Sequence, residues 1–411
     1  MGGTAGLLLG GCSSGATGPS SPTSQTSPSS PSGTGGGGVD EEEALARAYT
    51  FLDRRVEEAA GGTRQGLPRS YTGGWMETHH STVAFTYDVA LTVIAYCARG
   101  TDADLRRAGA LAGTLLALQE GDAAGDGRVR QSYVSGKVTA ADGLPAVAAA
   151  DSFTGAQAWT GLALLHVHRA TDGAAYRSGA LRLAEWIQDH TASTTGTPGH
   201  TGGVPASGSP LTWKSTEHNV DVAAFFRGLA DVTGDRAWAD RSAVATGFVD
   251  ALWDADAGAF WTGTGTDGAT VNRSPVPEDP QSWSYLATAD ARHAGSLDWA
   301  LTHLAAEDGG FSGVSVSDAD TSKVWFEGTA HMAAALRRRD GEGDAARAGD
   351  LLATLRSAQA HAPNADGHGI VAASSDGLRT GDGDTLYASL HTGTTAWFAL
   401  AAQGADPFLL E

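Results

Sequence analysis

Residues 220–253 read VDVAAFFRGLADV, then TGD, then RAWADRSAVATGFVDALW, and this stretch predicts two antiparallel helices. The first part, residues 220–232, is apolar on nearly every side, which is typical of a helix that is buried all round. The second part, residues 236–253, is amphipathic and would keep one face in solvent. The short turn Thr233-Gly234-Asp235 suits a hairpin, because Gly can end one helix and Asp can cap the next.

The same alternation recurs along the chain at a spacing of about 65 residues, as expected of a repeat made of one hairpin and one long loop. Strand-forming residues are sparse, so the pattern predicts an all-α class. With an opening helix over residues 40–60, it predicts twelve helices. The apolar helices are expected at residues 83–99, 154–170, 220–232, 282–289, 326–336 and 391–402, and their amphipathic partners at residues 102–118, 174–190, 236–253, 296–304 and 345–360.

Six such hairpins resemble the (α/α)6 toroid of the six-hairpin glycosidase superfamily, and the resemblance covers residues 40–411. It implies a single all-α domain with an inner ring of six apolar helices and an outer ring of six amphipathic helices. It also implies a carbohydrate site at the mouth where the inner helices begin. A superhelical repeat array is the alternative architecture. The long Gly-rich loops at residues 196–208 and 258–279 favour the toroid, because repeat arrays normally have brief loops.

The N-terminal segment predicts a lipid anchor on a tether. Leu7-Leu8-Leu9-Gly10-Gly11-Cys12 closes residues 1–12 and resembles a bacterial lipobox, in which Cys12 would be acylated. The basic region and the full apolar run of a signal peptide are missing, which predicts a start site further upstream; a chance cysteine is the alternative. Residues 13–39 contain almost only Ser, Thr, Pro and Gly, which is typical of a disordered linker. We therefore expect a secreted protein, or a lipoprotein on the extracellular face of the bacterial membrane.

The charge of the chain excludes several classes of partner. Its formal net charge of −20 would repel nucleic-acid phosphates and anionic lipid headgroups, so we expect no nucleic acid and membrane contact only through the lipid. No cofactor motif is present. Glu327 and His331 have i, i+4 spacing and His79 and His80 are adjacent, but neither pair makes a three-ligand set, so no metal is predicted. The expected partner of a monomeric chain is a carbohydrate.

Polar and aromatic residues collect at the start of each apolar helix. Helix N-termini carry partial positive charge and free N–H groups, which suit hydroxyl-rich ligands. Aromatic faces stack on sugar rings, and polar groups bind the hydroxyls. The candidate substrate-binding residues are Tyr87, Asp151, Gln157, Trp159, Trp213, His218, Asn219, Asp221, Gln281, Trp283, Trp325, His331, His391 and Trp397.

Three carboxylates in these segments are candidate catalytic groups. Hydrolysis of a glycosidic bond needs one protonated carboxyl to assist the leaving group and one carboxylate to activate water or attack carbon. Glu217 is the predicted general acid, because Trp213 and Phe225 suggest an apolar setting that would raise its pKa. Asp88 or Glu327 would be the base. A buried ion pair is the structural alternative for both glutamates.

These features favour an extracellular glycoside hydrolase, and the resemblance implies that it inverts the anomeric configuration. Asp151 and Asp279 precede their helices, so a capping role is the alternative for both. A lyase or sugar epimerase on the same fold is a second hypothesis, which could use Tyr87, His218 and His331 but has only Lys214 as a nearby cation. A non-catalytic glycan-binding lipoprotein is a third, and it would keep the aromatic residues without needing close carboxylates.

Overall fold

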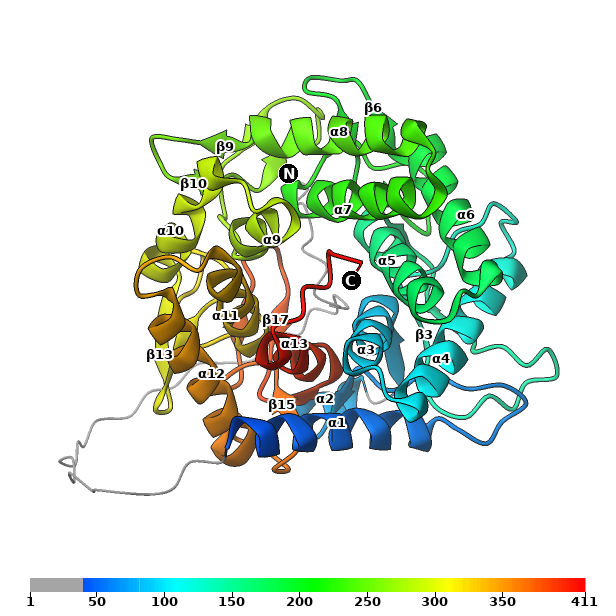
Figure 1. Cartoon of the computed structure of the whole chain (residues 1–411), viewed down its shortest axis with the longest axis horizontal. Helices are drawn as coiled ribbons and strands as arrows, with labels where there is room; N and C mark the ends of the chain where they lie inside the picture. Colours follow the sequence, from blue (N-terminus) through cyan, green and yellow to red (C-terminus); the bar gives the residue numbers. More distant parts are fainter. Residues whose placement is uncertain (1–39, 81, 411) are drawn as a thin grey trace.

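The computed structural model describes residues 40–80 and 82–410, and within them twelve helices form two concentric rings (Figure 1). Neighbouring inner helices contact each other in chain order, and the last contacts the first, so the ring is closed. The predicted (α/α)6 toroid is confirmed. The inner helices are α3 (Thr86–Arg99), α5 (Thr154–Thr171), α7 (Thr216–Thr233), α9 (Asp279–Thr288), α11 (Phe326–Arg339) and α13 (Thr392–Gln403). The outer helices are α1 (Glu41–Glu58), α4 (Asp102–Gly121), α6 (Ala174–Thr191), α8 (Arg236–Ala251), α10 (Gly295–His303) and α12 (Asp344–His361).

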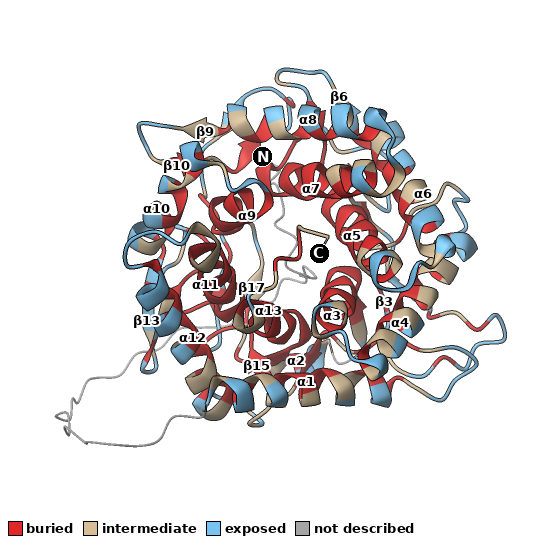
Figure 2. Ribbon diagram, viewed as in Figure 1, coloured by how far each residue is buried: buried red, intermediate tan, exposed pale blue. Residues whose placement is uncertain are grey.

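Burial separates the two rings in the way the sequence predicts. The inner helices are buried on nearly all sides, whereas the outer helices alternate between buried and exposed faces (Figure 2). Burial of apolar side chains on both sides of the inner ring supplies the main stabilisation of such a fold. The inner ring therefore holds the residues at its helix N-termini in fixed positions.

The turns inside the hairpins have the predicted chemistry. Helix α7 ends at Thr233, and its C-cap residue Gly234 has a φ of 69°. Asp235 then caps α8 by accepting a hydrogen bond from the Ala237 N–H. Only a residue without a Cβ adopts this left-handed conformation at no steric cost. In the turn after α5, the left-handed residue is Asp172 (φ 55°) rather than the glycine that follows it.

Short antiparallel strands, which the sequence did not predict, connect the hairpins. Strands β2, β5 and β18 end directly before α3, α5 and α13, so they fix where these inner helices start. The pairs are β1 (Tyr71–Thr72) and β15 (Ile370–Val371) with β18 (Leu390–His391), β2 (Val83–Phe85) and β4 (Val147–Ala149) with β3 (Ser132–Val134), β5 (Ser152–Phe153) with β8 (Gly203–Val204), β6 (Ala192–Ser193) with β7 (Gly199–His200), β9 (Trp253–Asp254) with β10 (Ala259–Phe260), β11 (Gly263–Thr264) with β12 (Val271–Asn272), β13 (Ala305–Asp308) with β14 (Phe311–Val314), and β16 (Leu378–Arg379) with β17 (Thr385–Leu386).

Smaller elements complete the described chain. A short helix α2 (Gly74–His79) lies between α1 and α3, and a 3-10 turn (Ala291–His293) separates α9 from α10. The segment after α13 lies along the axis of the ring (Figure 1). There the aromatic ring of Phe408 packs against that of Trp159, with a centroid separation of 5.0 Å. Among the described residues, no helix is both long and apolar enough to cross a membrane. Cys12 and the predicted linker at residues 13–39 lie outside the described residues.

Candidate active site

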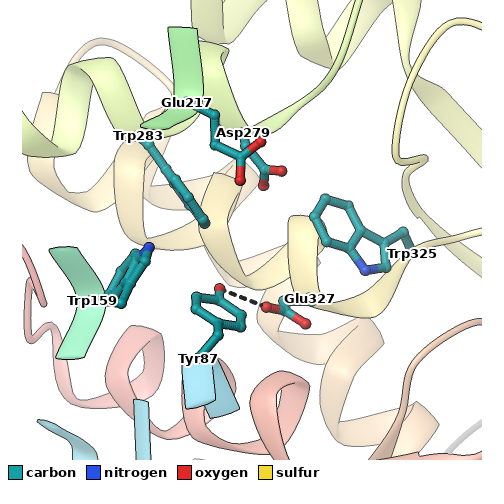
Figure 3. A pocket seen from close by; sticks show the side chains of 7 residues that line it. All are labelled: Tyr87, Trp159, Glu217, Asp279, Trp283, Trp325 and Glu327. Atoms are coloured by element: carbon teal, nitrogen blue, oxygen red, sulfur yellow. Dashed lines mark hydrogen bonds between the residues drawn. The ribbon is translucent and has the colours of Figure 1, made fainter. Parts of the chain in front are cut away.

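A narrow pocket lies where the inner helices begin, and aromatic and carboxyl side chains line it (Figure 3). Its free volume is about 10 Å³, which is about enough for one water molecule. Five of the six inner helices contribute a residue from their first two turns or from the position just before the helix. The lining residues are Tyr87, Trp159, Glu217, Asp279, Trp283, Trp325 and Glu327.

Glu217 extends into this pocket from the first turn of α7. Its neighbour Ser215 caps the helix, which sets the direction of the first turn. The side chain is only 3% exposed, and burial raises the pKa of Glu217 well above its usual range; the nearby carboxylates of Asp279 and Glu327 raise it further. Figure 3 shows the carboxyl groups of Glu217 and Asp279 together on one side of the pocket, with Glu327 on the other. Glu217 therefore holds a proton at pH values where an exposed glutamate has lost it.

Glu327 is equally buried but has the opposite electrostatic setting. Its Oε1 accepts a hydrogen bond from the Tyr87 hydroxyl at 2.8 Å, and its Oε2 lies 3.2 Å from Nδ1 of His391. Burial alone would raise the pKa of Glu327, but the hydrogen bond and positive charge of His391 outweigh it and lower the pKa. The following residue, Gly328, has the ring of Trp325 where a Cβ would be, at 2.3 Å. This glycine lets the indole fold over the start of α11 beside the carboxylate.

His391 links Glu327 to Asp88 and is the cation of the site. Its Nε2 lies 3.3 Å from Oδ1 of Asp88, and its ring stacks on Tyr71 with a centroid separation of 4.3 Å. Burial opposes the charged imidazolium, but the charges and hydrogen bonds of Asp88 and Glu327 prevail and raise the pKa of His391 to about 10. A Cβ on Gly393 would lie 2.5 Å from Oδ1 of Asp88, so a glycine is required there. Asp88 and Glu327, the two predicted base candidates, thus share one imidazolium.

We predict that His391→Asn shifts the acid side of the activity profile. Asparagine is a favoured residue at the helix N-terminus that His391 occupies, but it carries no charge. Without the imidazolium the pKa of Glu327 rises, so Glu327 becomes protonated already at mildly acidic pH. We expect the acid limb of kcat/KM against pH to move upward by about one unit or more, with far less change at neutral pH. An acid limb at the wild-type position would contradict this role of His391.

The same imidazolium gives a matching prediction for stability. Its pKa is raised from 6.5 to about 10 in the folded chain, so its stabilisation is complete below pH 6.5 and is lost as the pH rises through 10. The difference in unfolding free energy between wild type and His391→Asn should therefore shrink between pH 7 and pH 10. Denaturant unfolding at both pH values measures it, and a difference that stays constant would argue against a charged His391.

Two further carboxyls are functional candidates: Asp279, for which the sequence left a capping role as the alternative, and Glu278, which the sequence pattern did not indicate. Asp279 makes no capping hydrogen bond at α9; its carboxyl lines the pocket, and burial together with the charge of Glu327 raises its pKa well above the usual range. Glu278 lies behind it, accepting a hydrogen bond at 3.0 Å from Nδ1 of His331, and burial raises the pKa of Glu278 to about 7. Glu278 precedes α9 and Asp279 is its first residue, and a carboxylate at a helix start is most simply explained as a cap.

Glu278, Asp279 and His331 also form a three-group set that could hold a metal ion. One ligand atom from each lies within 4.8 Å of the others, and all three residues are buried. The spacing of residues along the sequence did not predict this set, because its members come from the starts of two different inner helices. Nδ1 of His331 is 3.0 Å from Glu278 Oε2 and 3.2 Å from Asp279 Oδ1, so the imidazole itself already joins the two carboxyls.

Several predicted substrate-binding residues have their hydrogen-bonding groups engaged within the fold. Gln157 bonds the backbone N–H and C=O of Val129, and Gln281 bonds those of Phe260 in the same way. Asn219 bonds the N–H and C=O of His200. Each of these amides lies near the fourth position of its inner helix and hydrogen-bonds the backbone of a neighbouring loop. The same contact therefore holds a loop against three of the inner helices.

The remaining predicted residues lie around the pocket rather than in its lining. Trp397 donates a hydrogen bond to the Tyr87 hydroxyl at 2.8 Å and so orients the donor to Glu327. Asp151 accepts from the Ala206 N–H at 2.9 Å, outside the pocket. Trp213 and His218 pack together with ring centroids 5.8 Å apart, and burial lowers the pKa of His218 to about 3.

Asp221 is a further buried carboxyl in this region, one turn after Glu217 on α7. Burial raises its pKa well above the usual range; Glu217 and Asp279 raise it further, and the Trp159 indole opposes the shift.

Comparison with solved structures identifies known proteins that share the fold of this chain. The structure of a D-mannose isomerase matches with a TM-score of 0.64 and 10% identity, over 89% of this chain and 96% of its own. The chain has the (α/α)6-toroid fold. A GH76 α-mannanase of Bacteroides thetaiotaomicron matches with a TM-score of 0.59 and 12% identity, over 89% and 96%. A sugar epimerase from a ruminal bacterium matches with a TM-score of 0.64 and 13% identity, over 88% and 98%. The sequence matches no family model and no curated protein.

Proposed function

We propose that this (α/α)6 toroid is a carbohydrate-active enzyme, and specifically a glycoside hydrolase. The observation that carries the proposal is the pair of buried carboxyls whose environments drive their pKa values apart. Glu217 is raised by burial, and Glu327 is lowered by its imidazolium partner, within one aromatic-lined pocket. A protonated acid facing an ionised base is the requirement for glycosidic hydrolysis.

In the proposed mechanism Glu217 is the general acid. It donates its proton to the glycosidic oxygen as the bond to the anomeric carbon breaks. Its neighbour Asp279 is also buried with a raised pKa, so the two carboxyls would be expensive to ionise together. This arrangement keeps a proton available on the Glu217 side of the pocket.

Glu327 is the proposed base. Its two oxygens are held by Tyr87 and His391, which fixes the orientation of the carboxylate. In the proposed mechanism this carboxylate faces a water molecule on the other side of the sugar. The base takes a proton from that water while the water attacks the anomeric carbon, which inverts its configuration. Asp88, the other predicted base candidate, supports this role by holding His391.

The aromatic walls support a hydroxyl-rich ligand. The indole N–H groups of Trp283 and Trp325 are buried and have no hydrogen-bond partner among the residues that the structure describes. A buried donor without a partner costs about 1–3 kcal/mol, so a ligand acceptor such as a sugar hydroxyl would relieve that cost. The faces of the same rings can stack on the C–H surface of a pyranose.

The alternatives receive less support from the site. An epimerase could use Tyr87, His218 and His331 to exchange protons with the substrate, but only Tyr87 lines the pocket, and its hydroxyl donates to Glu327. A lyase would need a cation for a uronate, and Lys214 is buried with its ammonium bonded to the carbonyls of Thr195 and Thr197. A binding module would have no need for three buried carboxyls around one pocket, which are costly to bury.

Hydrolysis can be tested directly with a panel of neutral oligosaccharides. We expect the protein to release reducing sugar from at least one member, and proton NMR of the first product to show the inverted anomer. Epimerised or isomerised sugar without bond cleavage would replace this proposal with the epimerase alternative. Absence of both reactions, with measurable glycan binding, would leave a binding protein.

We also propose that the enzyme works outside the cell, held by a lipid on Cys12. The proposal rests on the lipobox-like residues 7–12 and on the Ser/Pro/Gly-rich composition of residues 13–39. Such a tether would let the catalytic ring reach glycans beyond the membrane surface.

A further inference from the structure

The segment that follows α13 lies behind the pocket, and its residue Phe408 reaches two of the pocket walls. The segment runs along the ring axis (Figure 1), and Phe408 is buried there, at 2% exposure. The aromatic ring of Phe408 packs against those of Trp159 and Trp283, with centroid separations of 5.0 and 5.7 Å. Both indoles line the pocket, whereas Phe408 does not. Phe408 is therefore placed to support two walls of the pocket from behind.

Packing is the main restraint on the orientation of these two indoles. The indole N–H of Trp283 is buried and has no hydrogen-bond partner among the residues that the structure describes. For Trp159, the ring of Phe408 is nearer than the rings of Tyr87 and Trp283, which both lie at 5.3 Å. A buried aromatic side chain without a polar anchor takes the orientation that its packed neighbours allow. Loss of the Phe408 ring would therefore free both indoles to move.

Side chains from three inner helices hold the segment around Phe408 in place. Nε2 of His166 on α5 donates at 3.0 Å to the carbonyl of the residue before Phe408, and Arg227 on α7 donates at 3.2 Å to the carbonyl of Phe408 itself. Arg338 on α11 lies 3.4 Å from the carboxylate of Asp406, which accepts a hydrogen bond from the Phe408 N–H at 3.0 Å. These contacts fix the backbone on both sides of Phe408 and so direct its ring at the two indoles.

The pocket has little room to spare, so its size depends on how far its walls can retreat. Its free volume is about 10 Å³, about enough for one water molecule. A sugar ring can therefore enter only when side chains around the pocket move apart. Trp159 and Trp283 cannot retreat towards Phe408, because closely packed rings resist overlap. The two indoles backed by Phe408 thus form the fixed side of the pocket.

We propose that Phe408 determines the size of the sugar that the pocket accepts. The inference rests on the proposed carbohydrate-active function. Phe408 is a specificity-determining residue that acts through Trp159 and Trp283 rather than by touching the substrate. With the phenyl ring in place, the pocket suits a pyranose whose ring substituents are hydroxyls. Without it the two indoles retreat, and a sugar with a bulkier ring substituent is admitted.

The test compares the whole protein with Phe408→Ala and the milder Phe408→Leu on paired nitrophenyl glycosides. The members of a pair differ by an acetamido group in place of one hydroxyl, as in glucose with N-acetylglucosamine and galactose with N-acetylgalactosamine. We expect the preference in kcat/KM for the hydroxyl sugar to fall about tenfold in Phe408→Ala and about threefold in Phe408→Leu, because a few extra atoms in a tight pocket decide selectivity on this scale. Benzene at saturation should fill the space left in Phe408→Ala and restore the preference. A cavity of about 310 Å³ beside the segment gives benzene a route to this space.

Phe51→Leu is the matched control for Phe408→Leu. Phe51 is equally buried, at 1% exposure, but it lies on outer helix α1. Both variants should lower the melting temperature, whereas only Phe408→Leu should change the preference between paired sugars. Near-ultraviolet circular dichroism reads the packing of the indoles without any sugar. We expect its tryptophan bands to change in Phe408→Ala and to return with benzene, and an unchanged spectrum would contradict the role of Phe408.

Other results would also overturn the inference. An unchanged preference in folded Phe408→Ala, an equal shift in Phe51→Leu, or a wild type that accepts acetamido sugars as readily as their partners would each do so. Benzene that restores the melting temperature but not the preference would show a purely structural role. If the wild type binds these glycosides without cleaving them, the ratio of dissociation constants replaces the ratio of rates. A changed ratio without any cleavage would refute the proposed reaction and retain the role of Phe408.

Discussion

Replacing Glu217 by glutamine should lower kcat/KM on a natural-type glycoside by about 10²- to 10⁴-fold, the usual contribution of a general acid. Glutamine has the same size and fills the same buried position, but it has no proton to give to the glycosidic oxygen. The fold should tolerate the change, because the wild-type carboxyl is already held in its uncharged form by burial. Steady-state rates and the melting temperature of the same preparations measure both effects.

The dependence on leaving group distinguishes a lost acid from a disturbed site. An aryl glycoside whose phenol departs without protonation should recover most of the activity in Glu217→Gln, because it bypasses the missing step. Glu185→Gln, on the exposed face of outer helix α6, serves as the matched control and should behave as wild type on both substrates. Equal loss on activated and natural substrates would remove Glu217 from the role of acid.

Replacing Glu327 by glutamine should also lower the rate by about 10²- to 10⁴-fold, and a good leaving group should not restore it. The activation of water is needed whatever the leaving group, so this variant should fail on both substrates. The change also removes one carboxylate partner of the buried His391, and breaking such pairs typically costs about 3–5 kcal/mol.

A stability control is therefore essential for Glu327. Asp88 remains as a second partner of His391 at 3.3 Å, so we expect a folded protein with a lowered melting temperature. Glycan binding by the folded variant should persist while hydrolysis is lost. Activity within tenfold of wild type would move the role of base to another carboxyl, for which Asp279 is the remaining candidate in the pocket lining.

The fold was predictable because its signals are local and repeated. Alternation of buried and amphipathic helices appears in each hairpin, and turns such as the one at Gly234 require a specific residue type at a specific place. The short strands were not predictable in the same way. Most are two residues long, too short to establish a period, and they form only because distant loops are brought together, as at Tyr71 and His391.

The site was predictable in outline but not in its partnerships. Glu217 and Glu327 were found from their positions at helix starts, yet whether each is charged depends on neighbours from other helices. His391 pairs with Glu327 across 64 positions of sequence, a contact that no local pattern contains. The same limit applies to Gln157 and Asn219, which were expected to bind substrate. Their side-chain amides instead hydrogen-bond backbone groups of adjacent loops.

In the proposed mechanism Glu217 acts in its protonated form and Glu327 in its ionised form. The most direct measurement is kcat/KM against pH on a natural-type glycoside, whose leaving group needs protonation, compared between wild type and the residual activity of Glu217→Gln. Wild type should give a bell, with an acid limb below the usual glutamate range from Glu327 and an alkaline limb above it from Glu217. Glu217→Gln should keep the acid limb and lose the alkaline one. An unchanged alkaline limb in that variant would contradict the claim.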